Sequence, residues 1–221
     1  MKTFLFSLNI LLILVITSLL KVDNIRSEIY SQLVLYLGGV KVAFVGDSLT
    51  RRNSDLAMLV GGMSFHSKNF AIDGYTIPQI QRQLTDSVIP KSPCLGVVMA
   101  GTNRQEGDSL AENTQKYKNM LASLTAQNIS IIVMETFLTD NSDVNNYINQ
   151  LNANIKAYAL DKEIVYFPSN DYLSDEHALI SRFSLDGVHL NQTGYEVLNQ
   201  QLLPYIKQNY ISRRRECNNI F

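Results

Sequence analysis

The sequence predicts an α/β domain, a three-layer α/β/α sandwich built on a mostly parallel sheet of about five strands. Short apolar runs alternate along the chain with longer stretches in which apolar residues recur at helical spacing. Parallel strands are joined by crossover helices, so this alternation predicts a sheet covered on both faces. The apolar run at 94–100, bounded by Pro93 and Gly101, is typical of a strand buried on both sides.

Most of the expected strands are short apolar segments that end at glycine or polar turn residues, and the second is a mixed segment. They span 41–45, 65–72, 94–100, 129–134 and 164–167. A helix is expected after each of the first four strands, and a final helix closes the domain. These helices are expected from the turn after the first strand to residue 60, just after Pro78, over 110–124, over 144–158 and over 194–208.

The N-terminal segment differs from this domain. Residues 4–20 are predominantly apolar, and their length falls at the lower end of the ~17–25 residues that span a membrane. Because no Ala-x-Ala site follows, the sequence favours an uncleaved anchor at 1–21 over a cleaved signal peptide. We therefore expect a membrane-anchored protein facing the extracytoplasmic side, or an exported one. A connecting helix is expected at 22–40, the main domain at 41–210 and a basic tail at 211–221.

Composition excludes several classes of protein. The chain has 19 Lys and Arg against 20 Asp and Glu, and this near balance argues against a nucleic-acid partner. Two cysteines, Cys94 and Cys217, are too few for a disulfide scaffold or a structural zinc site. The sequence leaves open whether these two form a disulfide. It also leaves the oligomeric state open.

Glycine and polar residues follow the ends of the predicted strands. Gly46–Leu49 (GDSL) follows the first strand, Gly74 lies in the segment after the second, and Gly101–Asn103 (GTN) follows the third. Asp186 and His189 stand three residues apart just before the last helix. Each segment alone could be an ordinary turn or helix cap. The carboxyl ends of parallel strands share one edge, however, so we expect these residues to meet there.

The order of these segments resembles the SGNH (GDSL-type) hydrolase family over about residues 41–208. Ser48, Gly74, Asn103 and His189 occupy the four positions that give the family its name. The resemblance implies a flavodoxin-like fold and a serine esterase that needs neither a metal nor an organic cofactor. It also implies an ester substrate, in a range from short acyl esters and acetylated sugars to lysophospholipids and thioesters.

Chemistry assigns roles to the same residues. Ester hydrolysis needs a nucleophile, a base and donors for the oxyanion. Ser48 is the expected nucleophile, and His189 is the expected base because an unperturbed imidazole titrates near about pH 6.5. Asp186 would accept the other ring N–H and stabilise the imidazolium. The expected oxyanion donors are the backbone N–H groups of Ser48 and Gly74 and the side-chain amide of Asn103.

Three further residues are candidates for substrate binding. Arg104 follows Asn103 where the family often has an acidic residue, and Arg51 follows the nucleophile turn. Either could bind a carboxylate or phosphate, or simply lie on the surface. Tyr75 could form an aromatic wall beside Gly74.

The membrane-directed N-terminus and the near-neutral charge favour removal of acetyl groups from an extracytoplasmic glycan. A lipase or lysophospholipase is an alternative, and so is an acyltransferase that uses the same acyl-enzyme. A catalytically silent glycan-binding module is the alternative from a different class of protein.

Overall fold

The computed structural model describes residues 39–53, 67–105, 107–175 and 177–217, with side chains up to residue 210. The expected anchor, most of the connecting helix and the segment 54–60 of the first domain helix lie outside the described residues. Residues 39 and 40 belong to no helix. None of the described helices is long and apolar enough to cross a membrane.

Five parallel strands form one sheet in the described part of the chain, which confirms the predicted sheet. The sheet order is β2-β1-β3-β4-β5. The chain places β2 on one side of β1 and the remaining strands on the other side. The direction therefore reverses between β1 and β3, which is the point where ligands bind in open α/β sheets. The strands are β1 (Val42–Val45), β2 (Ser67–Asn69), β3 (Leu95–Val98), β4 (Ser130–Met134) and β5 (Val165–Phe167).

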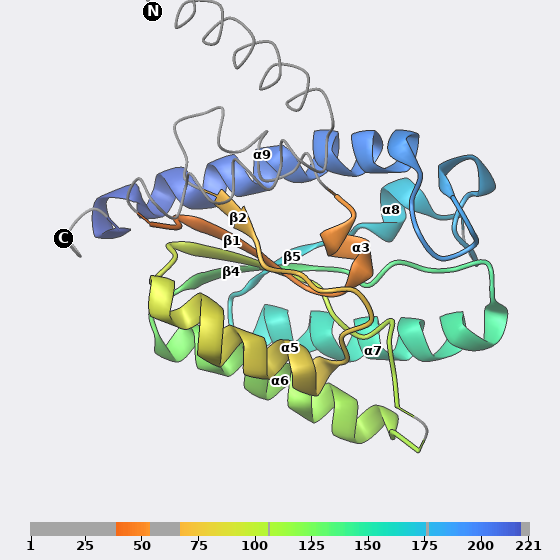
Figure 1. Cartoon of the computed structure of the whole chain (residues 1–221), viewed down its shortest axis with the longest axis horizontal. Helices are drawn as coiled ribbons and strands as arrows, with labels where there is room; N and C mark the ends of the chain where they lie inside the picture. The colour runs from red at the N-terminus through yellow and green to blue at the C-terminus, as the bar shows by residue number, and fades with distance from the viewer. Residues whose placement is uncertain (1–38, 54–66, 106, 176, 218–221) are drawn as a thin grey trace, which may run out of the picture.

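Helices cover both faces of the sheet, as predicted (Figure 1). One face carries α5 (Ile77–Gln83), α6 (Leu110–Ala126) and α7 (Ser142–Asp161). The other face carries α8 (Asn170–Leu173) and α9 (Gln192–Cys217). The shorter elements are α3 (Ser48–Arg51), the short π-helix η1 (Leu84–Val88) and the 3₁₀ helices η2 (Ile89–Lys91) and η3 (Ser181–Phe183).

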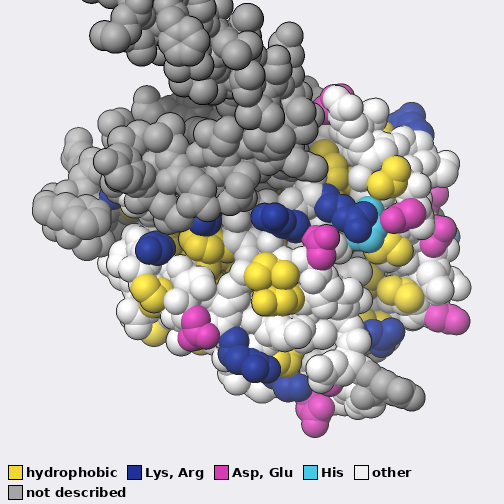
Figure 2. Space-filling model, viewed as in Figure 1, with side chains coloured by type: hydrophobic (Ala, Val, Ile, Leu, Met, Phe, Trp, Pro, Cys, Tyr) yellow, Lys and Arg dark blue, Asp and Glu magenta, His cyan; other side chains and the backbone are white. Residues whose placement is uncertain are grey.

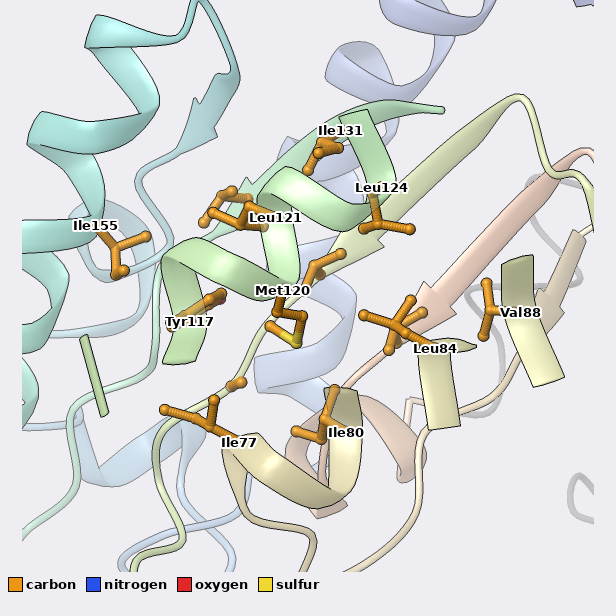
Figure 3. Close-up of a cluster of buried hydrophobic side chains, with 14 of the residues drawn as sticks. Ile77, Ile80, Leu84, Val88, Tyr117, Met120, Leu121, Leu124, Ile131 and Ile155 are labelled. Carbon is orange, nitrogen blue, oxygen red and sulfur yellow. The ribbon is translucent and has the colours of Figure 1, made fainter. Parts of the chain in front are cut away.

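Strand alternation divides the core into two layers. Val42 and Phe44 of β1 point to the α9 side, whereas Ala43 and Val45 point to the α5–α6–α7 side. Figure 3 shows the second layer, in which α5, η1 and α6 contribute most of the labelled side chains. Because strands that are buried on both faces must be apolar throughout, the continuous apolar runs in the sequence identified them correctly.

Capping residues set the starts of the long helices. The Ser109 hydroxyl accepts a hydrogen bond from the Glu112 N–H at the start of α6. The Asn141 side chain accepts from the N–H groups of Asp143 and Val144 at the start of α7. Each cap satisfies backbone donors that have no partner within the helix.

The last helix is longer than expected. We predicted a helix over 194–208 followed by a basic tail at 211–221, but the backbone of α9 is helical from Gln192 to Cys217. The basic residues Arg213–Arg215 therefore continue the helix, because no glycine or proline stands between residues 205 and 217 to end it. The side chain of Cys217, and with it the Cys94–Cys217 pair, lies outside the described part of the chain.

Candidate active site

The turn after β1 carries Ser48. Asp47 caps α3, with its Oδ1 accepting from the Leu49 N–H at 3.0 Å, and Ser48 is the first residue of that helix. At Gly46, a Cβ atom would lie 2.5 Å from the Thr50 hydroxyl and 2.7 Å from the Met99 carbonyl oxygen. Only glycine fits there, so the chain can turn tightly from strand to helix. The turn leaves Ser48 9% exposed at the carboxyl end of the strand.

A tight loop before α9 carries Asp186 and His189. The Asp186 carboxylate accepts the backbone N–H groups of Val188 (3.1 Å) and His189 (2.8 Å), which folds the loop back on itself. Gly187 between them has a φ of 86°, a conformation that favours glycine. The Leu185 N–H donates to the His189 carbonyl at 2.8 Å and closes the loop.

Ser48, His189 and Asp186 form one hydrogen-bonded row. The His189 Nε2 lies 2.9 Å from the Ser48 Oγ. The His189 Nδ1 lies 2.8 Å from the Asp186 Oδ2 and 3.1 Å from its Oδ1. An ionised carboxylate can only accept, so Nδ1 carries the proton and Nε2 is left to accept from the serine hydroxyl.

The charge on Asp186 is strongly favoured. Hydrogen bonds from the backbone and the ring of His189, with a further one from the backbone of Val188, lower the pKa of Asp186 to about 2. The carboxylate is therefore ionised throughout the neutral range and can orient the ring and stabilise its protonated form.

The loop after β2 brings Gly74 to the same edge. The Ile72 N–H donates to the Gly46 carbonyl at 3.2 Å, and the Asn69 amide donates to the Thr50 carbonyl at 2.8 Å. These bonds tie the loop to the turn that carries Ser48. Gly74 has a φ of 74°, so a side chain there would strain the backbone even though space is open.

Asn103 joins this loop from the end of β3. Its Nδ2 donates to the Tyr75 carbonyl at 3.2 Å, which fixes the amide beside Gly74 and leaves its second N–H available. Within the described part of the chain, no hydrogen bond engages the backbone N–H of Ser48 or of Gly74. The three turns that carry the predicted oxyanion donors are thus linked by hydrogen bonds, and each of these groups keeps an N–H that no described residue accepts.

The predicted substrate-binding residues lie in different settings. Tyr75 is half-buried and packs against the core under α5 and α6. The Arg104 guanidinium stacks on the Tyr147 ring at 4.1 Å from its centroid, so it is held against the start of α7. Arg51 is exposed at the end of α3.

Two charged residues beside the row were not among the predicted site residues. Arg52, and not its neighbour Arg51, pairs with Asp186, with an Nη1–Oδ2 distance of 3.9 Å. Asp47 is completely buried next to Ser48. Sequence could have pointed to Asp47, since it belongs to the turn that contains the nucleophile. No sequence pattern separates Arg52 from Arg51.

The surface view in Figure 2 shows an exposed histidine beside both basic and acidic side chains. Among the described residues, no group of three or more His, Cys, Asp or Glu side chains could hold a metal ion.

A serine–histidine–aspartate row at the carboxyl edge of a parallel sheet is an arrangement found in serine hydrolases. The model of the GDSL-like lipase/acylhydrolase family matches residues 44–197. The chain belongs to this family, as the sequence predicted, and is an ester hydrolase.

Solved structures with the same fold agree with this assignment. A Bacteroides fragilis protein proposed to be an acylhydrolase is 25% identical with a TM-score of 0.71, over 81% of this chain and 94% of its own. A GDSL-like lipase from Bacteroides thetaiotaomicron is 22% identical with a TM-score of 0.70, over 82% and 97% of the two chains. An acetyl xylan esterase is 19% identical with a TM-score of 0.63, over 76% and 100%. The last two show likeness of fold alone. No curated protein matches the chain.

Proposed function

We propose that this protein is a serine esterase that removes short acyl groups, acetyl above all, through an acyl-enzyme on Ser48. The observation that carries the proposal is the continuous row from the Ser48 hydroxyl through both nitrogens of His189 to Asp186. Neither a metal ion nor an organic cofactor has a role in this chemistry.

The reaction has two halves. In the first, the Ser48 Oγ attacks the ester carbonyl while its proton passes to the His189 Nε2, over the 2.9 Å that separates them. His189 then gives that proton to the leaving alcohol. In the second half, water attacks the acyl-enzyme, its proton passes to Nε2 and then to the Ser48 oxygen, and the carboxylic acid leaves.

The negative charge of each tetrahedral intermediate needs donors. We assign this role to the backbone N–H groups of Ser48 and Gly74 and to the second N–H of the Asn103 amide. No described residue accepts a hydrogen bond from these N–H groups, so they remain available to the oxyanion. We expect Asn103→Ala to lower kcat by about 10²–10³-fold with a small change in KM. A rise in KM with kcat unchanged would instead assign Asn103 to ground-state binding of the substrate.

The proposed substrate is an acetylated glycan outside the cytoplasm. Three features support it: the apolar segment at 4–20, the charged side chains of Arg52 and Asp186 at the row, and the fold shared with an acetyl xylan esterase. We propose that the N-terminal segment holds the protein at a membrane or exports it. A lipase is the second candidate, favoured by two exposed apolar side chains beside the site, Ile72 and Leu185.

The test is hydrolysis of p-nitrophenyl esters, from acetate to laurate, by the full-length protein in detergent. We expect the highest kcat/KM on acetate and its loss by at least about 10³-fold in Ser48→Ala. Ser123→Ala is the matched control, since this serine lies on α6 and donates only to the Met120 carbonyl. A maximum at long chains would assign the site to a lipase. Equal activity in Ser48→Ala would refute the acyl-enzyme.

A further inference from the structure

One guanidinium group beside the row has no part in the chemistry described so far. Arg52 follows α3, and its backbone N–H donates to the Ser48 carbonyl at 3.0 Å, so it stands one helical turn after the nucleophile. Residues four apart lie on the same face of a helix, with their Cβ atoms about 5–6 Å apart. Arg52 and Ser48 therefore share one face of this turn.

The Arg52 side chain reaches the outer end of the row. Its Nη1 lies 3.9 Å from the Asp186 Oδ2, the same oxygen that lies 2.8 Å from the His189 Nδ1. The side chains of Arg52 and Asp186 are 39% and 45% exposed, so solvent reaches both. Arg52 is thus close to the catalytic residues and open to a ligand.

The contact with Asp186 leaves the guanidinium with donors to spare. Hydrogen bonds from N–H to oxygen span about 2.7–3.2 Å, so at 3.9 Å the two charges attract each other without sharing a hydrogen. No described residue accepts a hydrogen bond from the Arg52 side chain. Asp186 is already oriented by the backbone N–H groups of Val188 and His189 and by the His189 ring, so its position does not depend on Arg52.

We propose that Arg52 is a specificity-determining residue that binds a carboxylate on the alcohol portion of the ester. The inference rests on the proposed function, in which the acyl group is acetyl. An acetyl group carries no charge of its own, so an anion that pairs with Arg52 belongs to the alcohol portion. The preferred substrate is then an acetylated sugar that also bears a carboxylate, as uronic acids do.

The neighbouring charge favours a carboxylate over a phosphate. The planar fork of a guanidinium can donate two parallel hydrogen bonds to either group. A carboxylate brings one negative charge close to Asp186, whereas a phosphate monoester brings nearly two, and the repulsion grows in proportion. A singly charged, planar anion is therefore the better partner for Arg52.

The kinetic test compares two acetyl esters that differ in one charge, p-acetoxybenzoate and the neutral p-acetoxybenzamide, with the full-length protein in detergent. In Arg52→Gln, the ratio of kcat/KM for the first ester to that for the second should fall about tenfold. The fall should come from a rise in KM for p-acetoxybenzoate, because its carboxylate is remote from the bond that breaks. Arg52→Lys should keep part of the ratio, since lysine retains the charge but not the fork.

Arg51→Gln is the matched control. It removes the same charge from the neighbouring position, whose direction differs by about 100° on a helix, so the ratio should keep its wild-type value. Both arginines are exposed, so the fold should be retained, which far-UV circular dichroism checks. An equal fall of kcat on both esters in Arg52→Gln would make Arg52 a support for Asp186 only, and would overturn the proposal. A larger effect of Arg52 on p-acetoxyphenyl phosphate would overturn the choice of a carboxylate.

A binding measurement separates this proposal from the proposed function. Isothermal titration calorimetry would use p-acetamidobenzoate and p-acetamidobenzamide, in which an amide replaces the ester that reacts. The wild type should bind the anionic compound more tightly than the neutral one, and Arg52→Gln should bind it about tenfold more weakly. If this preference is found but no acetyl ester is hydrolysed, the proposed function fails and the anion site stands. If the wild type binds the two compounds equally or not at all, the proposal is wrong, whatever the activity.

Discussion

Asp186 is nearly half exposed, yet its ionised form is held by four contacts from two residues. Its pKa of about 2 in the fold lies below the ordinary value of 3.8. The sign follows directly: ionised Asp186 stabilises the fold above about pH 4, and this contribution disappears as the pH falls through 2. Protonation of Asp186 therefore does not lower the activity above about pH 3.

Replacing Asp186 by asparagine should lower kcat by about 10⁴-fold with little change in KM, because an amide can leave the imidazole in the wrong tautomer. Steady-state kinetics on p-nitrophenyl acetate measures it. Asp175→Asn is the matched control, since Asp175 accepts the N–H groups two and three residues ahead just as Asp186 does, yet lies outside the row. Comparable losses in both variants would mean that loop folding, and not the ring contact, explains the effect.

The segment after β4 supports the loop that holds the histidine. Asn152 pairs with both backbone groups of Thr136, and Asn145 does the same with Thr139. These buried amides hold an irregular segment as a neighbouring strand would. At the end of this segment, the Asp140 N–H donates to the Gly187 carbonyl at 2.8 Å, so the segment contacts the loop between Asp186 and His189.

Gly187→Ala should disturb this contact. A Cβ at residue 187 would run into the Asp140 carboxylate, and the φ of 86° strains any side chain. Gly107→Ala is a matched control, because Gly107 has the same φ and open space around its Cβ position. Both variants should lose about 1 kcal/mol of stability in urea unfolding, but only Gly187→Ala should also lower kcat, by at least about tenfold. Equal kcat values in the two variants would show that the contact between Asp140 and Gly187 does not position His189.

At the scale of elements, the sequence predicts most of the fold. β1, β3 and β4 were recoverable because burial on both faces demands unbroken apolar runs, as in Leu95–Val98. The edge strand β2 is the polar segment Ser67–Asn69, and it ends three residues before the end of the expected strand at 65–72, of which residues 65 and 66 lie outside the described part of the chain. The end of α9 could not be predicted, because its last turns have a polar sequence that is equally typical of a solvated tail. The ends of the strands determine where Ser48, Gly74 and Asn103 lie, so this part of the site could be predicted.

The side chains that modulate the row were harder to predict. Arg51 and Arg52 are neighbours in sequence, and their directions differ by about 100° on a helix, so only the orientation of α3 decides that Arg52 meets Asp186. The complete burial of Asp47 is likewise a property of the folded chain that its place in the sequence does not determine.

For the whole molecule, the distribution of exposed apolar side chains bears on the substrate. The large exposed hydrophobics of the described residues are Ile72, Leu160 and Leu185. Ile72 stands two residues before Gly74 and Leu185 directly before Asp186, so both adjoin the site loops, whereas Leu160 lies at the far end of α7.

Replacing Ile72 or Leu185 by serine should raise KM for butyrate and longer esters about tenfold or more, since about 0.8 kcal/mol is lost for each methylene group that is no longer covered. The KM for acetate should change little. Leu160→Ser should leave both values unchanged. The measurement is the ratio of the two KM values for each variant, and an equal effect of all three substitutions would rule out a role in acyl binding.

The elements that carry the nucleophile and the base are joined by contacts between opposite ends of the chain. The Tyr195 hydroxyl donates to the Leu49 carbonyl, and the side chains of Asn53 and Asn199 pair with each other, 146 residues apart in both cases. A ribosome therefore releases the serine well before it has made the histidine or the helix that holds the two in register. Contacts of such long range form late in folding, so the unfinished chain is inert towards esters. The hydrogen bond between Ser48 and His189 can therefore form only after nearly all of the domain has been synthesised.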